Sequence, residues 1–327
     1  MATALCSLAI EMVAAFCEEH PHVLCLHAAA AKRGEHTLLL LGDNHAGKST
    51  LLSRLLADGW TSLGDDLIGV MEEGKIMSFG IPLRLRLPLP PSSELARFVH
   101  SCGGIRDGRY LHLRTEPHSA PFGTISSPTH ILVLQRRSRI KAELLPLKRL
   151  AGLIRLMPHY VMRTGSAEST FRYAAELMHR TSASLFRYDD LDEAAALLRQ
   201  FSECGLSQPR AYVSSGKGRT NIPEVPPVIQ TKEHVFKETQ EQYIRSSNVR
   251  TFHEYGRAFL VNQDTDIIYG LNRTGELLWS LLADPLSEKE ATLFLHRCFP
   301  GTDRERIRRD MSSLFRELKE KRLIRHV

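Results

Sequence analysis

The sequence predicts an α/β domain followed by a smaller α+β domain. Strand-like and helix-like patterns alternate through the first third of the chain, which is typical of α/β folds. Between residues 204 and 240 the apolar periodicity disappears, and a Ser-Ser-Gly-Lys-Gly run and several prolines indicate a linker. The remaining residues place short strands before helices. We therefore expect a first domain over 1–203, a linker over 204–240 and a second domain over 241–327.

The composition is that of a soluble globular protein. The chain has 327 residues, of which 43% are hydrophobic and 24% charged, so we exclude a disordered, collagen-like or membrane-embedded chain. The apolar N-terminal stretch has no basic residue before Lys32, so a secretory signal is disfavoured and a cytoplasmic location is expected. The net charge of +6 suits phosphate-bearing or acidic partners, and equally a solvated basic surface.

The first third of the chain supplies the elements around the strongest motif. A leucine stripe predicts a helix that begins at Lys48, and Gly59 follows its end, as C-terminal caps prefer. Before it we expect a helix and two strands, and after it a short strand that ends at an aspartate pair. In chain order these are a helix over 4–17, strands over 23–28 and 37–41, the helix over 48–58 and the strand ending at 65–66.

The middle of the chain is less regular. The segment 81–128 is rich in Pro, Arg and Gly, which indicates loops with short strands. Beyond it we expect a pair of strands over 131–135 and 142–146. Three helices complete the domain over 150–157, 167–182 and 191–201.

The C-terminal segment predicts a compact module of winged-helix type. Three short antiparallel strands are expected over 249–254, 257–261 and 266–271. Three helices follow, from about Thr274, Ser287 and Thr302, and a last strand covers 323–325. Both Ser287 and Thr302 are followed three residues later by Glu, the pattern of a capping box.

The strongest functional signal is a phosphate-binding loop. The segment 42–49 reads G-x-x-x-x-G-K-S between a predicted strand and a predicted helix. Its backbone N–H groups would form a cradle for nucleotide phosphates, with Lys48 on the β- and γ-phosphates and Ser49 on Mg²⁺. The expected nucleotide-binding residues are Gly42, Asp43, Asn44, His45, Ala46, Gly47, Lys48, Ser49 and Thr50.

Two acids follow the loop after one helix and one short strand. Asp65 and Asp66 stand where a neighbouring strand delivers carboxylates beside the phosphates. One acid would hold Mg²⁺ and the other would accept a proton from an incoming hydroxyl, the two tasks of a phosphoryl-transfer site. A helix cap or a solvated turn is the other interpretation of such a pair.

Three more residues are weaker candidates. His27 ends the strand that precedes the phosphate-loop strand, although a lone histidine beside an alanine run is usually structural. Arg84 and Arg86 alternate on a short strand, and they would meet a phosphate or lie on an exposed edge.

These residues together resemble the HPr kinase/phosphorylase superfamily, especially its peptide-kinase-like branch in the biosynthesis of ribosomally made, modified peptides. The resemblance rests on Leu26-His27-Ala28, the loop 42–50, Gly59-Trp60 and Gly64-Asp65-Asp66, and it extends more weakly to residue 201. It implies an ATP- and Mg²⁺-dependent kinase in which Asp65 is the general base and Lys48 the phosphate clamp. It also implies that Asp66 and Ser49 are Mg²⁺ ligands and that His27 neighbours the reacting phosphate.

Two features depart from this pattern. His45 stands where the family commonly has a glycine, at a position that favours positive φ and strains other residues, so we expect reduced nucleotide affinity. The downstream signature segment is not recognisable between residues 80 and 128, which leaves phosphorylase-type activity in doubt.

The C-terminal module is similar to PqqD-like peptide-binding domains. The similarity rests on Phe259-Leu260-Val261, on the run 268–272, on Thr274-Gly275 and on Leu278-Trp279. It implies that a leader peptide adds a strand to the sheet edge and packs on the adjoining helix. Asn272 and Thr274 read first as helix caps, and Leu278, Trp279 and Leu282 read first as core.

Three functions therefore compete. The first is a kinase that phosphorylates a Ser or Thr hydroxyl of a precursor peptide captured by the C-terminal domain. The second is a nucleotide-gated scaffold that presents such a peptide without phosphoryl transfer. The third is an ATP-responsive DNA-binding regulator that uses the arginines of the last helix, although the acids interleaved with them favour a solvated, salt-bridged face. We expect a precursor peptide as partner, no membrane and no nucleic acid, and homo-oligomers are compatible with the sequence.

Overall fold

The computed structural model describes residues 2–43, 45–162, 166–204, 241–299 and 301–327. The predicted linker over 204–240, apart from its first residue, lies outside this range, as does Asn44. The chain divides into two compact units, residues 1–206 with 250–271, and residues 207–249 with 272–327. Among the described residues, no helix combines the length and apolar character needed to cross a bilayer.

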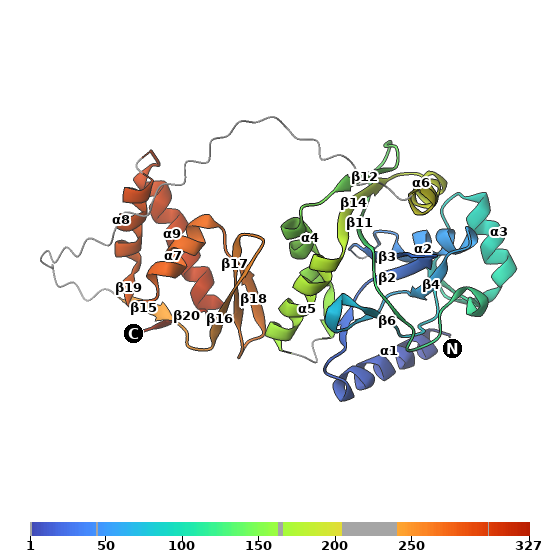
Figure 1. The fold of residues 1–327 in the computed structure, drawn as a ribbon, viewed down its shortest axis with the longest axis horizontal. Coiled ribbons are helices and arrows are strands. Elements are labelled where there is room, and N and C mark those ends of the chain that lie inside the picture. The colour runs from blue at the N-terminus through green and yellow to red at the C-terminus, as the bar shows by residue number, and fades with distance from the viewer. Residues whose placement is uncertain (1, 44, 163–165, 205–240, 300) are drawn as a thin grey trace, which may run out of the picture. The chain divides into compact units, whose positions relative to one another are not determined.

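The first unit is built on a mixed six-stranded sheet (Figure 1). Three parallel strands form its centre, and antiparallel strands flank them on both sides. In the three central strands, the register places Leu39 beside Ile131, and Ile131 beside Ala183. Across the sheet the order is β12 (Glu143–Pro146), β14 (Ser182–Tyr188), β11 (His130–Arg136), β3 (His36–Leu41), β2 (Ala29–Arg33) and β4 (Thr61–Gly64).

The other strands within residues 1–206 form two smaller sheets. The antiparallel five-stranded sheet has the order β10 (Ile125–Ser126), β6 (Ile76–Ser78), β5 (Ile68–Val70), β1 (Leu24–Leu26) and β13 (Tyr160–Met162). A three-stranded sheet has the order β7 (Arg84–Arg86), β9 (Tyr110–Leu113) and β8 (Gly104–Asp107). Because β1 and β5 are neighbours, the ends of these strands bring His27 and the aspartate pair to the same region.

Helices cover both faces of the six-stranded sheet because successive side chains of each strand point to opposite faces. Leu38 and Leu40 of β3 pack in one core with Leu51 and Leu55 of α2. Leu39 and Leu41 belong to the core on the other face, which contains residues of α4 and α5. The helices of this unit are α1 (Ala2–Glu19), α2 (Lys48–Ala57), α3 (Ser93–Cys102), α4 (Arg149–Leu156), α5 (Ala167–Arg180) and α6 (Leu191–Cys204), with short 3₁₀ turns at Glu72–Gly74, Glu116–His118 and Met157–His159.

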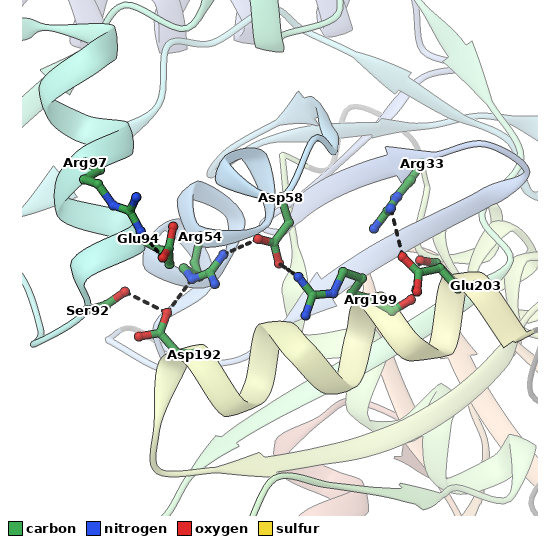
Figure 2. Close-up of polar contacts among 10 residues, drawn as sticks. Arg33, Arg54, Asp58, Ser92, Glu94, Arg97, Asp192, Arg199 and Glu203 are labelled. Carbon is green, nitrogen blue, oxygen red and sulfur yellow. Dashed lines mark hydrogen bonds and ion pairs between the residues drawn. The ribbon is translucent and has the colours of Figure 1, made fainter.

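An ion-pair network joins three of these helices (Figure 2). Arg54 of α2 is buried and donates to Asp58 at 2.6 Å and to Asp192 of α6 at 2.5 Å. Ser92, the N-cap of α3, donates to the same Asp192 oxygen at 2.8 Å. Arg199 of α6 lies 3.9 Å from Asp58. The helix that follows the phosphate loop is therefore tied to α3 and α6.

A three-stranded sheet near the C-terminus contributes to the core of the first unit. Its order is β16 (Val249–Glu254), β17 (Arg257–Asn262) and β18 (Ile267–Gly270). The ring of Phe259 lies 4.9 Å from that of Phe171 in α5, measured between centroids. Asp266 accepts a hydrogen bond from the backbone N–H of Ala167 at 2.8 Å. The domain borders expected at 203 and 241 stay a prediction.

In the second unit, the residues that the structure describes form three helices and a small sheet. The helices are α7 (Arg273–Leu281), α8 (Glu288–Cys298) and α9 (Arg304–Glu320), and the sheet has the order β19 (Leu286–Ser287), β15 (Gln242–Arg245) and β20 (Ile324–His326). Leu278, Leu295 and Phe315 are buried, one from each helix. The guanidinium of Arg245 lies over the Trp279 ring and donates to the Trp279 carbonyl.

Several expected elements are confirmed, and others are wrong. The capping box at Ser287 is present, because its hydroxyl accepts from Glu290 N–H and the Glu290 carboxylate accepts from Ser287 N–H. Thr302 is not a cap; Asp303 takes that position and accepts from the N–H of Arg306 at 3.1 Å. The carboxylate one residue closer to the helix satisfies the N–H of Arg306, where a cap at Thr302 would have satisfied that of Glu305.

The largest errors concern pairing and the segment 81–128. That segment contains a full helix, α3, whose Leu95 and Phe98 are buried in the core. The expected pair of strands near 131 and 142 does not form, because β14 lies between β11 and β12. The strand expected over 23–28 is shorter, because β1 ends at Leu26 and a separate strand, β2, begins at Ala29 in another sheet; His27 therefore lies in the connection between them and not in a strand.

Candidate functional site

A loop runs from the end of β3 into the start of α2, as the motif predicts. Within it the N–H of Ala46 donates to the Asp43 carbonyl at 3.0 Å. Gly47 has φ 95°, a left-handed conformation that favours glycine, and the helix begins directly after it. At Gly42 an added Cβ would lie 2.7 Å from the Cβ of Ala46, so the turn itself requires glycine there. The open N-terminus of α2 gives this loop the geometry of an anion cradle.

His45 adopts the left-handed backbone expected at its position, with φ 71°. Its ring is exposed, and the Nη1 of Arg86 on β7 lies 3.1 Å from its Nδ1. A side chain therefore occupies a position that costs backbone energy for any residue other than glycine. The same contact places Arg86 beside the loop.

Lys48 is almost fully buried, with 6% of its surface exposed. Its Nζ donates to the Gly42 carbonyl at 2.7 Å, across the loop that it follows. Burial lowers the pKa of Lys48, and the charges of Asp66, Asp65 and Asp43 oppose this shift. The ammonium group is thus held at the base of the cradle, where phosphate oxygens would replace the carbonyl as its partner.

Asp65 is sealed behind the loop, with 1% of its surface exposed. Its Oδ1 accepts a hydrogen bond from the Oγ of Ser49 at 3.0 Å, and its Oδ2 faces the N–H of Arg84 at 3.5 Å. Burial, followed by the charge of Asp66, raises the pKa of Asp65, while these hydrogen bonds oppose the rise. The serine expected on Mg²⁺ and the first acid of the pair are therefore in direct contact.

Asp66 is placed differently from its neighbour. Its backbone has φ 67°, and 31% of its side chain is exposed. The Nη2 of Arg84 lies 3.1 Å from its Oδ2, and the Nε2 of His27 lies 3.9 Å from its Oδ1. Arg84 is in turn stacked on the Tyr110 ring at 4.7 Å. Asp66 thus faces a basic group on each side.

His27 lies beside a second histidine that the sequence did not single out. The N–H of His27 donates to the carbonyl of His159 at 2.7 Å, and the two ring centroids are 6.4 Å apart. Burial, followed by the charge of Lys48, lowers the pKa of His27, while Asp66 opposes this shift. Burial and Lys48 also lower the pKa of His159. Both imidazoles are therefore favoured in the neutral form.

A cavity of about 700 Å³ opens over the loop. Its lining includes His27, Lys48, Ser49, Thr50 and Asp66, so most of the expected site residues are brought together. Gly42, Asp43 and Asp65 do not line it, and Asn44 is outside the described residues. The sequence did not single out further lining residues, which are Leu87, Pro88, Leu89, Pro90, Pro91, Tyr110, Arg136, Tyr188 and Leu191.

Two of these additional residues carry a signal that sequence reasoning can use. Arg136 and Tyr188 are the last residues of β11 and β14, the strands parallel to β3. Ligands of α/β sheets bind outside the carboxyl ends of parallel strands, so residues at these ends are candidates once the strand order is known. The proline-rich segment 87–91 carries no comparable signal.

The donor set of the loop fits a magnesium ion. Ser49 Oγ and Asp65 Oδ1 are hard oxygen atoms 3.0 Å apart beside the loop that would hold phosphates. Mg²⁺ commonly takes only one or two carboxylates and completes its shell with phosphate oxygens and water. A cluster of three or more His, Cys, Asp or Glu side chains suited to a metal is absent from the part of the chain that the structure describes.

Most of the C-terminal residues have the structural roles expected of them, but Thr274, expected as a helix cap, does not. Asn272 is the N-cap of α7 and accepts from the N–H of Gly275 at 2.8 Å, whereas Thr274 lies within the helix. Leu278, Trp279 and Leu282 are buried. On α9, Arg308 pairs with Glu305 at 2.8 Å, as a salt-bridged helix face predicts.

Comparison with known proteins identifies this C-terminal region. Residues 257–324 match the family model for coenzyme PQQ synthesis protein D (PqqD). The chain carries a PqqD domain. The match begins at β17 and ends in β20, so it includes strands grouped with the first unit and the helices of the second.

Two solved structures are similar to parts of the chain. One is TbiB1 in complex with the TbiA(beta) leader peptide, at 26% identity and a TM-score of 0.23, over 25% of this chain and 93% of that chain. The other is the HPr(Ser) kinase/phosphatase from Coxiella burnetii, at 11% identity and a TM-score of 0.29, over 54% of this chain and 95% of that chain. A search of curated proteins gives no match.

Proposed function

We propose that the protein is an ATP- and Mg²⁺-dependent kinase that transfers the γ-phosphoryl group to a Ser or Thr hydroxyl of a precursor peptide. The observation that carries the proposal is the loop between β3 and α2, with Lys48 at its base and the Ser49–Asp65 contact beside it, under a cavity of about 700 Å³. Cradle, cation and acid pair are the parts that phosphoryl transfer requires.

Within this proposal the chain's own groups have separate tasks. The loop amides and Lys48 bind and orient the triphosphate, and Thr50 and Tyr188 line the space around it. Ser49 and one acid hold the metal, which neutralises charge on the phosphates when bound. His27 lies near the reacting phosphate. Asp66 is fixed between Arg84 and His27 at the cavity wall.

The PqqD domain supports a precursor peptide as the substrate. The TbiB1 structure contains a leader peptide, and we propose that this PqqD domain likewise binds the leader of a precursor peptide, along an edge of the sheet β16–β17–β18. Binding the leader on the same chain as the kinase site replaces a bimolecular encounter by a high effective concentration of the acceptor. A catalytic site of modest intrinsic affinity then suffices for selectivity. We propose a cytoplasmic location.

Intact-mass measurement tests the kinase directly. The purified full chain is incubated with Mg-ATP and each short peptide encoded beside its gene, and we expect the mass of one phosphoryl group to be added to one of them. Lys48→Ala should lower the rate by at least about 100-fold, because transition-state charge loses its cation. Lys141→Ala, which changes an exposed lysine, is the matched control and should leave the rate unchanged.

A non-catalytic scaffold is the second candidate, and the left-handed His45 favours it. A strained residue in the phosphate loop would lower the affinity for nucleotide, and a gating role tolerates a lower affinity better than catalysis does. The scaffold predicts that peptide binding responds to ATP while no peptide gains mass. Phosphorylated peptide in the wild-type reaction, absent with Lys48→Ala, would exclude it.

A further inference from the structure

The two acids of the site differ in what each can touch. Asp65 has 1% of its surface exposed, and both of its oxygens face donors: the hydroxyl of Ser49 at 3.0 Å and the N–H of Arg84 at 3.5 Å. A carboxylate enclosed in this way has no free face for a hydroxyl that arrives through the cavity. It does lie against the serine that the motif assigns to the metal.

Asp66 has the opposite surroundings. It lines the cavity, and 31% of its side chain is exposed. Its left-handed backbone, with φ 67°, reverses the chain directly after Asp65, so neighbouring residues place their side chains in different environments. Arg84 at 3.1 Å holds one of its oxygens, and the other lies 3.9 Å from the Nε2 of His27.

Arg84 is itself fixed, so it holds Asp66 in a defined position. Its guanidinium stacks on Tyr110 at 4.7 Å, and its backbone belongs to β7, paired with β9. The arginine and the histidine both line the same cavity as Asp66. Asp66 and His27 line the cavity through which an acceptor hydroxyl would enter, whereas Asp65 is buried and does not line it.

We propose that the two acids divide their work in the reverse of the way the family resemblance implies. Asp66 takes the proton of the acceptor hydroxyl, and Asp65 acts with Ser49 on the metal side. Arg84 is a positioning residue that orients Asp66. The proposal rests on the proposed kinase function, which it deepens by naming the acid that faces the peptide.

The reaction balances with groups that the proposal already contains. The acceptor oxygen forms a bond to the γ-phosphorus, and the bond between that phosphorus and the β–γ bridging oxygen breaks. The bridging oxygen keeps the electron pair and leaves as part of ADP. The hydroxyl proton passes to the carboxylate of Asp66, which returns it to solvent through the cavity.

Matched isosteric variants of the full chain separate the two roles. We would measure ATP binding by calorimetry with and without Mg²⁺, and phosphoryl transfer by intact mass. Asp66→Asn should keep the gain in ATP affinity that Mg²⁺ gives the wild type, to within about 3-fold, while transfer falls by about 100-fold or more, the usual range for loss of a general base. Asp65→Asn should lose most of that Mg²⁺-dependent gain.

Two further variants keep the test decisive. If Asp65→Asn fails to fold, Ser49→Ala takes its place, because Ser49 makes the same contact and should lose the same Mg²⁺-dependent gain. Arg84→Lys, which keeps the charge but loses the planar fork, should lower the transfer rate and leave Mg²⁺-dependent binding unchanged.

The proposal and the kinase function fail in different ways. If the wild type binds Mg-ATP but transfers nothing to any peptide, the kinase function is overturned, and calorimetry still shows which acid supports the metal. If Asp66→Asn loses the Mg²⁺-dependent gain, or if Asp65→Asn keeps it while losing transfer, the reversed division is overturned even when the kinase function stands.

Discussion

His45 adds backbone strain to the phosphate loop. With φ 71° it occupies a region that costs an L-residue about 1 kcal/mol or more and costs glycine little. We expect His45→Gly to raise the free energy of unfolding by between about 0.5 and 1 kcal/mol, since the lost contact with Arg86 is exposed and worth little.

His45→Ala is the control for this prediction. It removes the same imidazole but keeps a Cβ at the left-handed position, so it should show no gain. Urea unfolding of the full chain measures all three proteins. Equal stabilities for the Gly and Ala variants would mean that the imidazole, and not the backbone, determines the energy of this loop.

At this scale the sequence predicts what is local and misses what the fold assembles. The loop residues are consecutive in the chain and belong to one motif with a known chemistry, and the aspartate pair follows after only one helix and one short strand. His159 and Tyr188 reach the site from distant segments, and neither belongs to a motif. Asp65 and Asp66 differ in burial, and Asp66 has a positive φ angle; the Asp-Asp sequence alone does not predict that angle.

Among the elements, α2 is held by charges as well as by its leucine stripe. Arg54 and Asp58 are nearly buried, with 6% and 10% of their side chains exposed, and Arg54 also reaches Asp192 at the start of α6 (Figure 2). Arg54→Met removes the cation and leaves Asp58 without its nearest partner. We expect the free energy of unfolding to fall by about 3 kcal/mol, because an uncompensated buried charge is costly.

Arg97→Met provides the comparison for the same urea experiment. Arg97 of α3 pairs with Glu94 on an exposed helix surface, where ion pairs contribute less than about 1 kcal/mol. Similar losses for both variants would show that the Arg54 network acts as a surface ion pair. The three-helix junction would then depend on apolar packing alone.

Element types were easier to predict than their order. Apolar periodicity predicts the helices over 150–157 and 191–201, because this pattern depends only on residues close together in the sequence. The placement of β14 between β11 and β12 is a long-range pairing that no local pattern encodes. The helix α3 is not predicted, because a proline-rich segment precedes it and its apolar stripe, with Leu95 and Phe98, is short.

On the scale of the whole molecule, the PqqD match and the compact units do not share their borders. The match covers 257–324, whereas contacts group 250–271 with the N-terminal unit. Phe252 and Phe259 lie against Phe171 of α5, with ring centroids 5.4 Å and 4.9 Å away. Sequence patterns alone place a border in the linker, because composition shifts there and packing between distant segments is not visible in them.

A double-mutant cycle decides whether these strands belong to the core of the first unit. Phe171→Leu and Phe259→Leu should show a coupling energy of about 0.5–1.5 kcal/mol in the full chain, the range for aromatic pairs in contact. Phe171→Leu and Phe315→Leu, a core residue of the second unit, should be additive. Coupling in the first cycle alone would mean that β17, which the PqqD match includes, packs in the core of the first unit, which also holds the loop between β3 and α2. Additivity in both cycles would instead favour an independent domain that begins at residue 241.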